Sequence, residues 1–261
     1  MTLTQAFDGS VDDRPDTPAL VIANNRLTYG QLDNLAAEMT GDLRDAGVSK
    51  GDSVWCNSRD ITLRLSGLLA CARTGSIFVD PDVTWSPQIR AWAWAAVRPG
   101  AVFSDGPDGP VKKIGSGIRR ASDYVSPGAN PNPDDPLDIK ATSGTTGEPK
   151  FSIRTHANHL HAIHADNTFA IGKGTTVALF GPAFTAAAAT TIGCGATLVL
   201  PATSHTEPFL EAAYKLKHGL QLVSDARMLG AKVINPTQPL SITQVSQGLA
   251  YLRRVMVLEG R

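Results

Sequence analysis

At residues 142–150 the chain reads Thr142-Ser143-Gly144-Thr145-Thr146-Gly147-Glu148-Pro149-Lys150. Glycine lets a backbone approach an anion closely and adopts positive φ without steric cost. Backbone N–H groups in such a turn form a concavity that binds phosphate. The hydroxyl side chains add hydrogen-bond donors, and the terminal lysine adds a positive charge. The stretch therefore predicts a phosphate-binding loop.

The stretch also has two alternative interpretations. The spacing differs from the phosphate loop written GxxxxGK[ST], because no Gly-Lys pair follows at that distance. A segment rich in Ser, Thr and Gly can also be a surface linker. Its context decides between a loop and a linker, because a motif is confirmed by the elements around it.

Strands alternate with helices on both sides of this loop. Thr28 and Gln31 have the spacing of a capping box, and an apolar stripe with helical period follows until Gly47. The predicted strands include Ser53–Asn57, Ser76–Asp80, Ala101–Ser104 and Leu137–Ala141, and the other predicted helices include Ile61–Thr74, Pro87–Val97, Ala157–Phe169 and Ala226–Ile234. This alternation predicts an α/β fold with a mostly parallel sheet flanked by helices.

Several segments carry weaker expectations. Residues 1–18 are polar and contain two prolines, so we expect them to wrap loosely over the surface. Residues near 105–136 are rich in Gly, Pro, Asp and Ser and predict a loop-rich connection. The histidines at 156, 159, 161 and 164 fan around a predicted helix, which favours helix-surface positions over a zinc site. The tryptophans at 85, 92 and 94 indicate core packing more than a ligand stack.

Composition limits the classes of function. The chain has 261 residues, with 24 basic and 24 acidic residues and a formal net charge of zero, which argues against nucleic acid or an anionic membrane as partner. Three scattered cysteines show no metal or disulfide spacing and favour a reducing, cytoplasmic environment. We expect no secretory signal, and no run approaches the roughly 20 apolar residues that cross a bilayer.

The stretch TSGTTGxPK at 142–150 resembles the phosphate-binding motif of the adenylate-forming superfamily, usually written TSG[T/S]TGxPKG. That family includes acyl-CoA ligases, luciferases and the adenylation domains of nonribosomal peptide synthetases. Phe151 stands where the motif usually has its last glycine. Residues 27–32 and 47–52 resemble the family's LTYxEL…GVxxGDxV opening, and residues 68–82 resemble its LKAGxxYVPLDP motif.

The resemblance implies ATP- and Mg²⁺-dependent activation of a small carboxylic acid as an acyl-adenylate. A thiol of CoA or of a carrier protein would be the acceptor. Lys150 would be the catalytic cation, and Phe184 and Thr185 would line the substrate pocket. Thr142 would brace the loop, and the residues that cradle the β- and γ-phosphates would be Ser143, Gly144, Thr145, Thr146 and Gly147. No protein ligand for a metal is predicted.

The resemblance covers about the first half of a family member, that is, part of an adenylating N-terminal domain. The later motifs of that domain and the C-terminal lid domain are not in the sequence. The chain is therefore expected to be a truncated form, or one half of a split enzyme completed by a homo- or hetero-oligomer. The alternative is a catalytically degenerate partner protein that binds a nucleotide or an acyl group.

Overall fold

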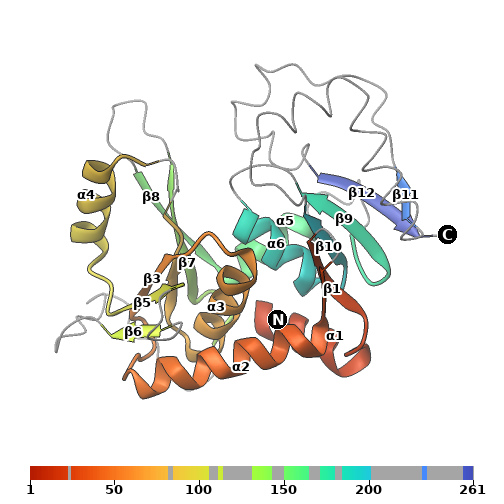
Figure 1. Ribbon diagram of the computed structural model, residues 1–261, viewed down its shortest axis with the longest axis horizontal. Helices are drawn as coiled ribbons and strands as arrows, with labels where there is room; N and C mark the ends of the chain where they lie inside the picture. Colours follow the sequence, from red (N-terminus) through yellow and green to blue (C-terminus); the bar gives the residue numbers. More distant parts are fainter. Residues whose placement is uncertain are drawn as a thin grey trace, which may run out of the picture.

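The structure is a computed structural model that describes residues 1–22, 25–81, 85–105, 111–113, 131–142, 150–164, 171–179, 184–200, 231–233 and 255–260. The strands within these ranges form two six-stranded sheets. In Figure 1 the first sheet lies at the left and the second at the right, and α2 runs below them. The α/β class is confirmed, while the division into two sheets was not predicted.

The first sheet has the strand order β6-β5-β3-β4-β7-β8. Its members are β3 (Ser53–Asn57), β4 (Ile77–Val79), β5 (Ala101–Ser104), β6 (Val111–Lys113), β7 (Pro136–Thr142) and β8 (Lys150–Thr155). The four central strands are parallel, and the two edge strands, β6 and β8, are antiparallel to their neighbours. β6 lies inside the predicted loop-rich connection, most of which falls outside the described residues.

The second sheet has the strand order β11-β12-β9-β10-β1-β2. Its members are β1 (Pro18–Ile22), β2 (Asn25–Thr28), β9 (Thr175–Leu179), β10 (Thr197–Leu200), β11 (Ala231–Val233) and β12 (Val255–Gly260). β1, β10 and β9 are parallel, and the remaining pairings are antiparallel. Like the first sheet, it has a parallel centre and antiparallel edges.

The helices are α1 (Leu3–Asp13), α2 (Tyr29–Asp45), α3 (Ile61–Thr74), α4 (Pro87–Val97), α5 (His156–His164) and α6 (Phe184–Gly193). The capping box at the start of α2 is confirmed, because the side chains of Thr28 and Gln31 each accept from the other's backbone N–H. Gly75 ends α3 with φ 73°, and a Cβ there would lie 2.8 Å from Cγ of Lys50. A glycine is therefore required at this turn.

The prediction for the N-terminal segment was wrong. Residues 3–13 form a helix, and its capping box joins Thr2 to Gln5. Leu3 and Phe7 are fully buried, and the ring of Phe7 lies 5.8 Å from that of Tyr29. Only two large apolar residues, four positions apart, create this buried stripe, so the polar composition of the segment concealed it.

The predicted helix 226–234 is also contradicted where the structure describes it. Ala231–Val233 is a strand that pairs with β12, with Val233 opposite Leu258. Strand pairing over this sequence distance overrides local helix propensity, which is a weak preference. The rest of the predicted helix lies outside the described residues.

The first sheet has two different faces because successive side chains of a strand point in opposite directions. We call one face the deep face. It belongs to the main core, which α2 and α3 share, and it comprises Val54, Cys56, Phe78, Ala101, Phe103 and Leu137. Leu137 joins this face, although Ile139 lies on the other, because the pairing of β7 is irregular between Pro136 and Asp138. The other, which we call the outer face, packs against α4. Its residues are Trp55, Val79, Val102, Ile139 and Phe151.

Within the part of the chain that the structure describes, no helix is both long enough and apolar enough to cross a membrane.

Candidate functional site

The predicted phosphate loop connects two paired strands. β7 ends at Thr142 and β8 begins at Lys150, and these two residues face each other in the antiparallel register. Residues 143–149 therefore close a hairpin, although they lie outside the described residues. Thr142 and Lys150 are brought together, whereas the positions of Ser143, Gly144, Thr145, Thr146 and Gly147 stay predictions.

The hairpin lies at the topological switch point of the first sheet, where two neighbouring parallel strands continue in opposite directions. β4 and β7 are parallel neighbours, but the chain leaves them in opposite directions. From β4 it runs through α4 to β5, beyond β3, and from β7 it turns outward to the edge strand β8. In open α/β sheets, ligands bind in the crevice at the carboxyl ends of two such strands. The loop at 143–149 follows the carboxyl end of β7 directly, so its context is that of a ligand-binding loop.

An ion pair lies at the carboxyl end of β4. One terminal nitrogen of Arg64, on α3, lies 2.7 and 2.8 Å from the two carboxylate oxygens of Asp80. The side chains are 8% and 15% exposed, respectively. The pair neutralises a carboxylate at the same crevice, where an unpaired negative charge would repel a phosphate. Sequence analysis missed Arg64, and the available signal was a lone arginine within an apolar helix.

A cleft of about 460 Å³ opens further along the same edge of the sheet. Its lining residues are Cys56, Asn57, Ser58, Arg59, Pro81, Arg90 and Asp105. Two hydrogen bonds organise it: Ser58 donates to Asp105 at 2.5 Å, and Arg90 donates to Asn57 at 2.7 Å. The carboxyl edge of this sheet therefore carries both a polar cleft and the predicted loop.

The two predicted substrate residues lie at the start of α6. Phe184 is its first residue, and the side chain of Thr185 is 2% exposed. The hydroxyl oxygen of Thr185 is buried and has no hydrogen-bond partner among the described residues. α6 packs against α5, which directly follows β8. The described contacts therefore place Thr185 in the interior, and α6 reaches the strands of the hairpin through α5 and α3.

Two of the four histidines of α5 are buried, whereas helix-surface positions were predicted. His156 and His159 are 1% and 3% exposed. Nδ1 of His156 accepts a hydrogen bond from the backbone N–H of Leu3 at 3.3 Å, which requires the neutral ring. Burial, with a smaller contribution from the neighbouring His159, lowers the pKa of His156 to about 4. His156 therefore caps the N-terminus of α1.

The second histidine belongs to a buried polar group. Nε2 of His159 lies 3.4 Å from Oδ1 of Asp138, which Arg154 also binds from the paired strand. Although burial opposes its charge, His159 and Arg154 hold the pKa of Asp138 below its usual range. Across the described ranges, no three His, Cys, Asp or Glu side chains group to hold a metal. His159, Asp138 and Arg154 therefore join α5 to β7 and β8.

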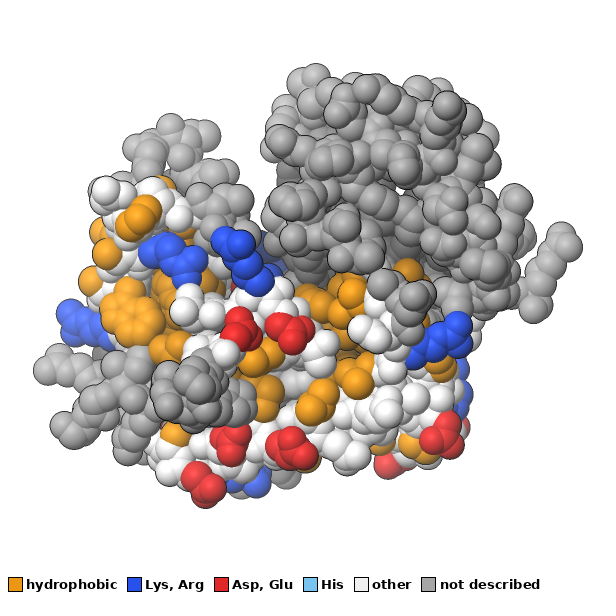
Figure 2. Space-filling view, in the orientation of Figure 1, with side chains coloured by type: hydrophobic (Ala, Val, Ile, Leu, Met, Phe, Trp, Pro, Cys, Tyr) orange, Lys and Arg blue, Asp and Glu red, His pale blue; other side chains and the backbone are white. Residues whose placement is uncertain are grey.

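The predicted packing role of the tryptophans is confirmed in part. Trp85 and Trp94 are partly buried around Ala93 and Trp55 on the outer face, and the rings of Trp55 and Trp94 meet edge to face at 5.2 Å. Trp92 is different: it is 39% exposed and stacks on Phe151. Figure 2 shows hydrophobic side chains on the surface over α4.

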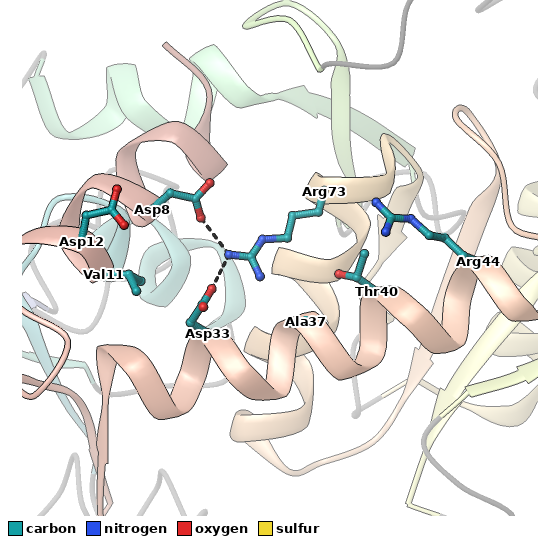
Figure 3. A pocket seen from close by; sticks show the side chains of 8 residues that line it. All are labelled: Asp8, Val11, Asp12, Asp33, Ala37, Thr40, Arg44 and Arg73. Carbon is teal, nitrogen blue, oxygen red and sulfur yellow. Dashed lines mark hydrogen bonds and ion pairs between the residues drawn. The ribbon is translucent and has the colours of Figure 1, made fainter.

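A larger cleft, of about 650 Å³, lies among α1, α2 and α3 (Figure 3). Arg73 reaches across it and pairs with Asp8 and Asp33. Although burial opposes the charge, these two carboxylates raise the pKa of Arg73. Its guanidinium also lies 5.9 Å from the centre of the Phe7 ring. None of the predicted site residues lines this cleft, and its charges join α1 to α2 and α3.

The cysteines are not candidates for chemistry. All three are free, and burial raises the pKa of Cys56 and of Cys71 to about 12. Thiols with such pKa values stay protonated near neutral pH and are poor nucleophiles.

The parallel centre of the first sheet and the switch point beside β7 define an open α/β protein. The chain belongs to the AMP-binding enzyme family, whose model matches residues 7–221. It is 32% identical over 230 residues to the equisetin synthetase eqxS of Fusarium heterosporum, a match that covers 79% of this chain and 6% of that protein.

Solved structures show the same fold. A putative long-chain-fatty-acid CoA ligase from Rhodopseudomonas palustris has a TM-score of 0.65 at 20% identity, over 82% of this chain and 60% of that one. The o-succinylbenzoate CoA synthetase from Bacillus subtilis, solved with an acyl-adenylate intermediate, has a TM-score of 0.64 at 19% identity. That match covers 80% of this chain and 59% of the other. The chain thus spans only part of each relative, and the fold is that of adenylating N-terminal domains.

Proposed function

We propose that this chain contributes the polyphosphate-binding part of an ATP-dependent enzyme that activates a carboxylic acid as an acyl-adenylate. The observation that carries the proposal is the hairpin at 142–150, which follows the carboxyl end of β7 at the switch point of the first sheet. In this proposal the backbone and hydroxyls of residues 143–147 hold the β- and γ-phosphates, and Lys150 neutralises them and the departing pyrophosphate.

Positioning and electrostatics account for the contribution of such a loop. Donors fixed at the place where charge develops stabilise a transition state without reorganising. Holding the polyphosphate also aligns the α-phosphate for in-line attack by the carboxylate. The Arg64–Asp80 pair removes a negative charge from the neighbouring strand end, which favours an anionic ligand. The adenine and ribose contacts would come from parts of the enzyme beyond this sequence.

Magnesium enters the proposal as MgATP. Mg²⁺ keeps several water ligands and is usually held by substrate phosphates together with one or two carboxylates. Among the described residues, no group of three or more His, Cys, Asp or Glu side chains is arranged to hold a metal. The fit of ATP to this chain therefore rests on the hairpin, and the metal would be carried to the site by the nucleotide.

The acceptor thiol and the completed assembly are proposals of the same kind. The acid would pass to CoA or to a carrier-protein thiol, and a further polypeptide segment or chain would supply the remaining groups. The second candidate is a catalytically degenerate partner protein that binds a nucleotide or an acyl group. A nucleotide-binding partner would require ATP binding, as the ligase does, but only the ligase requires chemistry.

Titration calorimetry with MgATP tests the shared requirement. We expect weak binding, which Lys150→Ala weakens about ten- to hundredfold, the factor that a hydrogen bond to a charged group supports. Lys173→Ala is the matched control, because Lys173 is an exposed lysine paired with Asp13 at the second sheet. Equal affinities of the wild type and Lys150→Ala would contradict the proposed role of Lys150.

Carboxylate-dependent exchange of pyrophosphate into ATP separates the two candidates. The assay is run with the chain alone and with the rest of an adenylating enzyme added as a second polypeptide. Exchange that depends on both parts and on Lys150 supports the ligase. MgATP binding without exchange in either case supports the binding protein.

A further inference from the structure

The ring of Phe151 stacks on the ring of Trp92. Their centroids are 5.3 Å apart, and the planes are inclined by 4°. Phe151 is the second residue of β8, and Trp92 lies in the middle of α4. Ring spacings of 4.5–7 Å with an offset are favourable aromatic geometry. The stack therefore links a helix to a strand of the first sheet.

The start of β8, where Phe151 lies, directly follows the predicted phosphate loop in sequence. Phe151 follows Lys150, and Lys150 faces Thr142 across the hairpin. β8 is an edge strand, so its backbone pairs with β7 on one side only. Edge strands are held less firmly than central ones, and their ends depend more on side-chain contacts. The Phe151 ring supplies such a contact at the first residues of β8.

The helix at the other end of the contact is itself anchored. Ala93 of α4 is fully buried on the outer face, and Trp94 meets Trp55 of the central strand β3 edge to face. Contacts through α4 therefore connect Phe151 with the central strand β3. Figure 1 shows α4 beside the start of β8, where the connection from β7 ends.

The contact lies at the margin of the outer-face cluster, against which Phe151 is partly buried. Trp92 is 39% exposed, so the stack lies at the surface. Ile153 lies two residues further along β8 and on the same face, yet it is 56% exposed. The first residues of β8 are thus tied to α4 by an aromatic pair, whereas the residue two positions on is left open.

We propose that Trp92 and Phe151 are positioning residues, which fix the start of β8 so that the backbone of Lys150 is held in place for polyphosphate binding. The inference rests on the proposed function. Pre-organising a binding segment raises affinity because less conformational entropy is lost on binding. The stack can change affinity only by its own free energy, which corresponds to about two- to tenfold in Kd.

The test is a double-substitution cycle read by titration calorimetry with MgATP. Phe151→Ala and Trp92→Ala should each raise Kd about two- to tenfold, and the double variant should be no weaker than the weaker single variant. Phe151→Tyr and Trp92→Phe keep a ring at each position and should bind like the wild type. Ile153→Ala, the matched control on the same strand face, should change Kd by less than about twofold.

Amide hydrogen exchange, measured without nucleotide, tests whether the Trp92–Phe151 stack holds the start of β8, independently of ATP binding. The amides at the start of β8, residues 150–152, should exchange faster in Phe151→Ala than in the wild type and in Ile153→Ala. Unchanged Kd values, additive effects of the two alanines, or unchanged exchange would overturn the positioning role. If the wild type binds no MgATP, the proposed function fails, and faster exchange in Phe151→Ala still shows the tie between α4 and β8.

Discussion

The two faces of the first sheet are built differently. On the deep face, Phe78, Phe103 and Leu137 are fully buried and continue into the core beneath α2 and α3. On the outer face, one helix covers the described strands, and Val102 and Phe151 are only partly buried. The same strands supply both faces, so the difference comes from what packs on each side.

This difference indicates a division of roles. Close-packed interiors tolerate little change in volume, so the deep face determines whether the chain folds. Surface contacts near a strand end contribute less to global stability and are free to adjust a binding segment. The Trp92–Phe151 stack lies on the outer face next to Lys150, the residue that follows the predicted phosphate loop in sequence.

The largest expected effect is on the deep face. Phe103→Ala should lower the free energy of unfolding by about 3–5 kcal/mol, because it leaves a cavity between α3 and the sheet. Its neighbour Val102 is the matched control on the opposite face, and Val102→Ala should cost about 1 kcal/mol. Urea unfolding measures both. Equal losses at the two positions would contradict the distinction between the faces.

The next largest effect concerns His156, a buried residue of α5. Because burial lowers the pKa of His156 to about 4, the unfolded chain binds more protons than the folded one between about pH 6.5 and 4. Stability should therefore fall as the pH falls through this window, with a contribution on the order of 3 kcal/mol from this residue.

Urea midpoints measured from pH 7 to pH 4 test the role of His156. His156→Asn is the comparison variant, because an amide oxygen can still accept from Leu3 N–H but does not titrate. The variant should lose less stability over this range than the wild type. Parallel curves would show that His156 does not titrate in the window.

A smaller effect is expected for the ion pairs that hold α1. Arg73→Met keeps an apolar side chain over Phe7 but removes the charge that pairs with Asp8 and Asp33. Both carboxylates are partly exposed, so the loss should be about 1 kcal/mol. The difference between the wild type and Arg73→Met should shrink at high salt, since salt screens such pairs. A loss that is independent of salt would indicate packing instead of charge.

The smallest effect is expected at Ile153, the most exposed large apolar residue of the outer face among those described. Ile153→Ala should change the free energy of unfolding by less than about 0.5 kcal/mol. A loss above 1 kcal/mol in urea unfolding would mean that the outer face at β8 is covered more than the structure indicates.

Much of the local structure followed from the sequence because its signals are short-ranged. The bounds of β3, α3, α4 and β5 agree with the predicted segments, and Thr28 caps α2 as its spacing predicted. Caps, turn glycines and apolar periods depend on neighbouring residues, so they can be recognised without the fold. The family also followed from short motifs, and its model matches most of the chain.

The errors arose where distant segments meet. Helix α1 is buried because α2, α3, α5 and α6 close around its short stripe, which composition does not show. His156 and His159 are interior residues because α1, α6 and β7 lie against α5. The stack of Trp92 on Phe151 joins residues far apart in sequence, and no local period indicates it.

By itself, the sequence determined the α/β class, the bounds of several elements, the phosphate-loop motif and the family, because these depend on local chemistry and spacing. The tertiary structure decided the division into two sheets, the placement of the hairpin beside β4, and the partners of Arg64, His156 and Phe151. These features depend on which strands pair and which helix faces meet, and that choice is made by the burial of apolar surface over the whole chain.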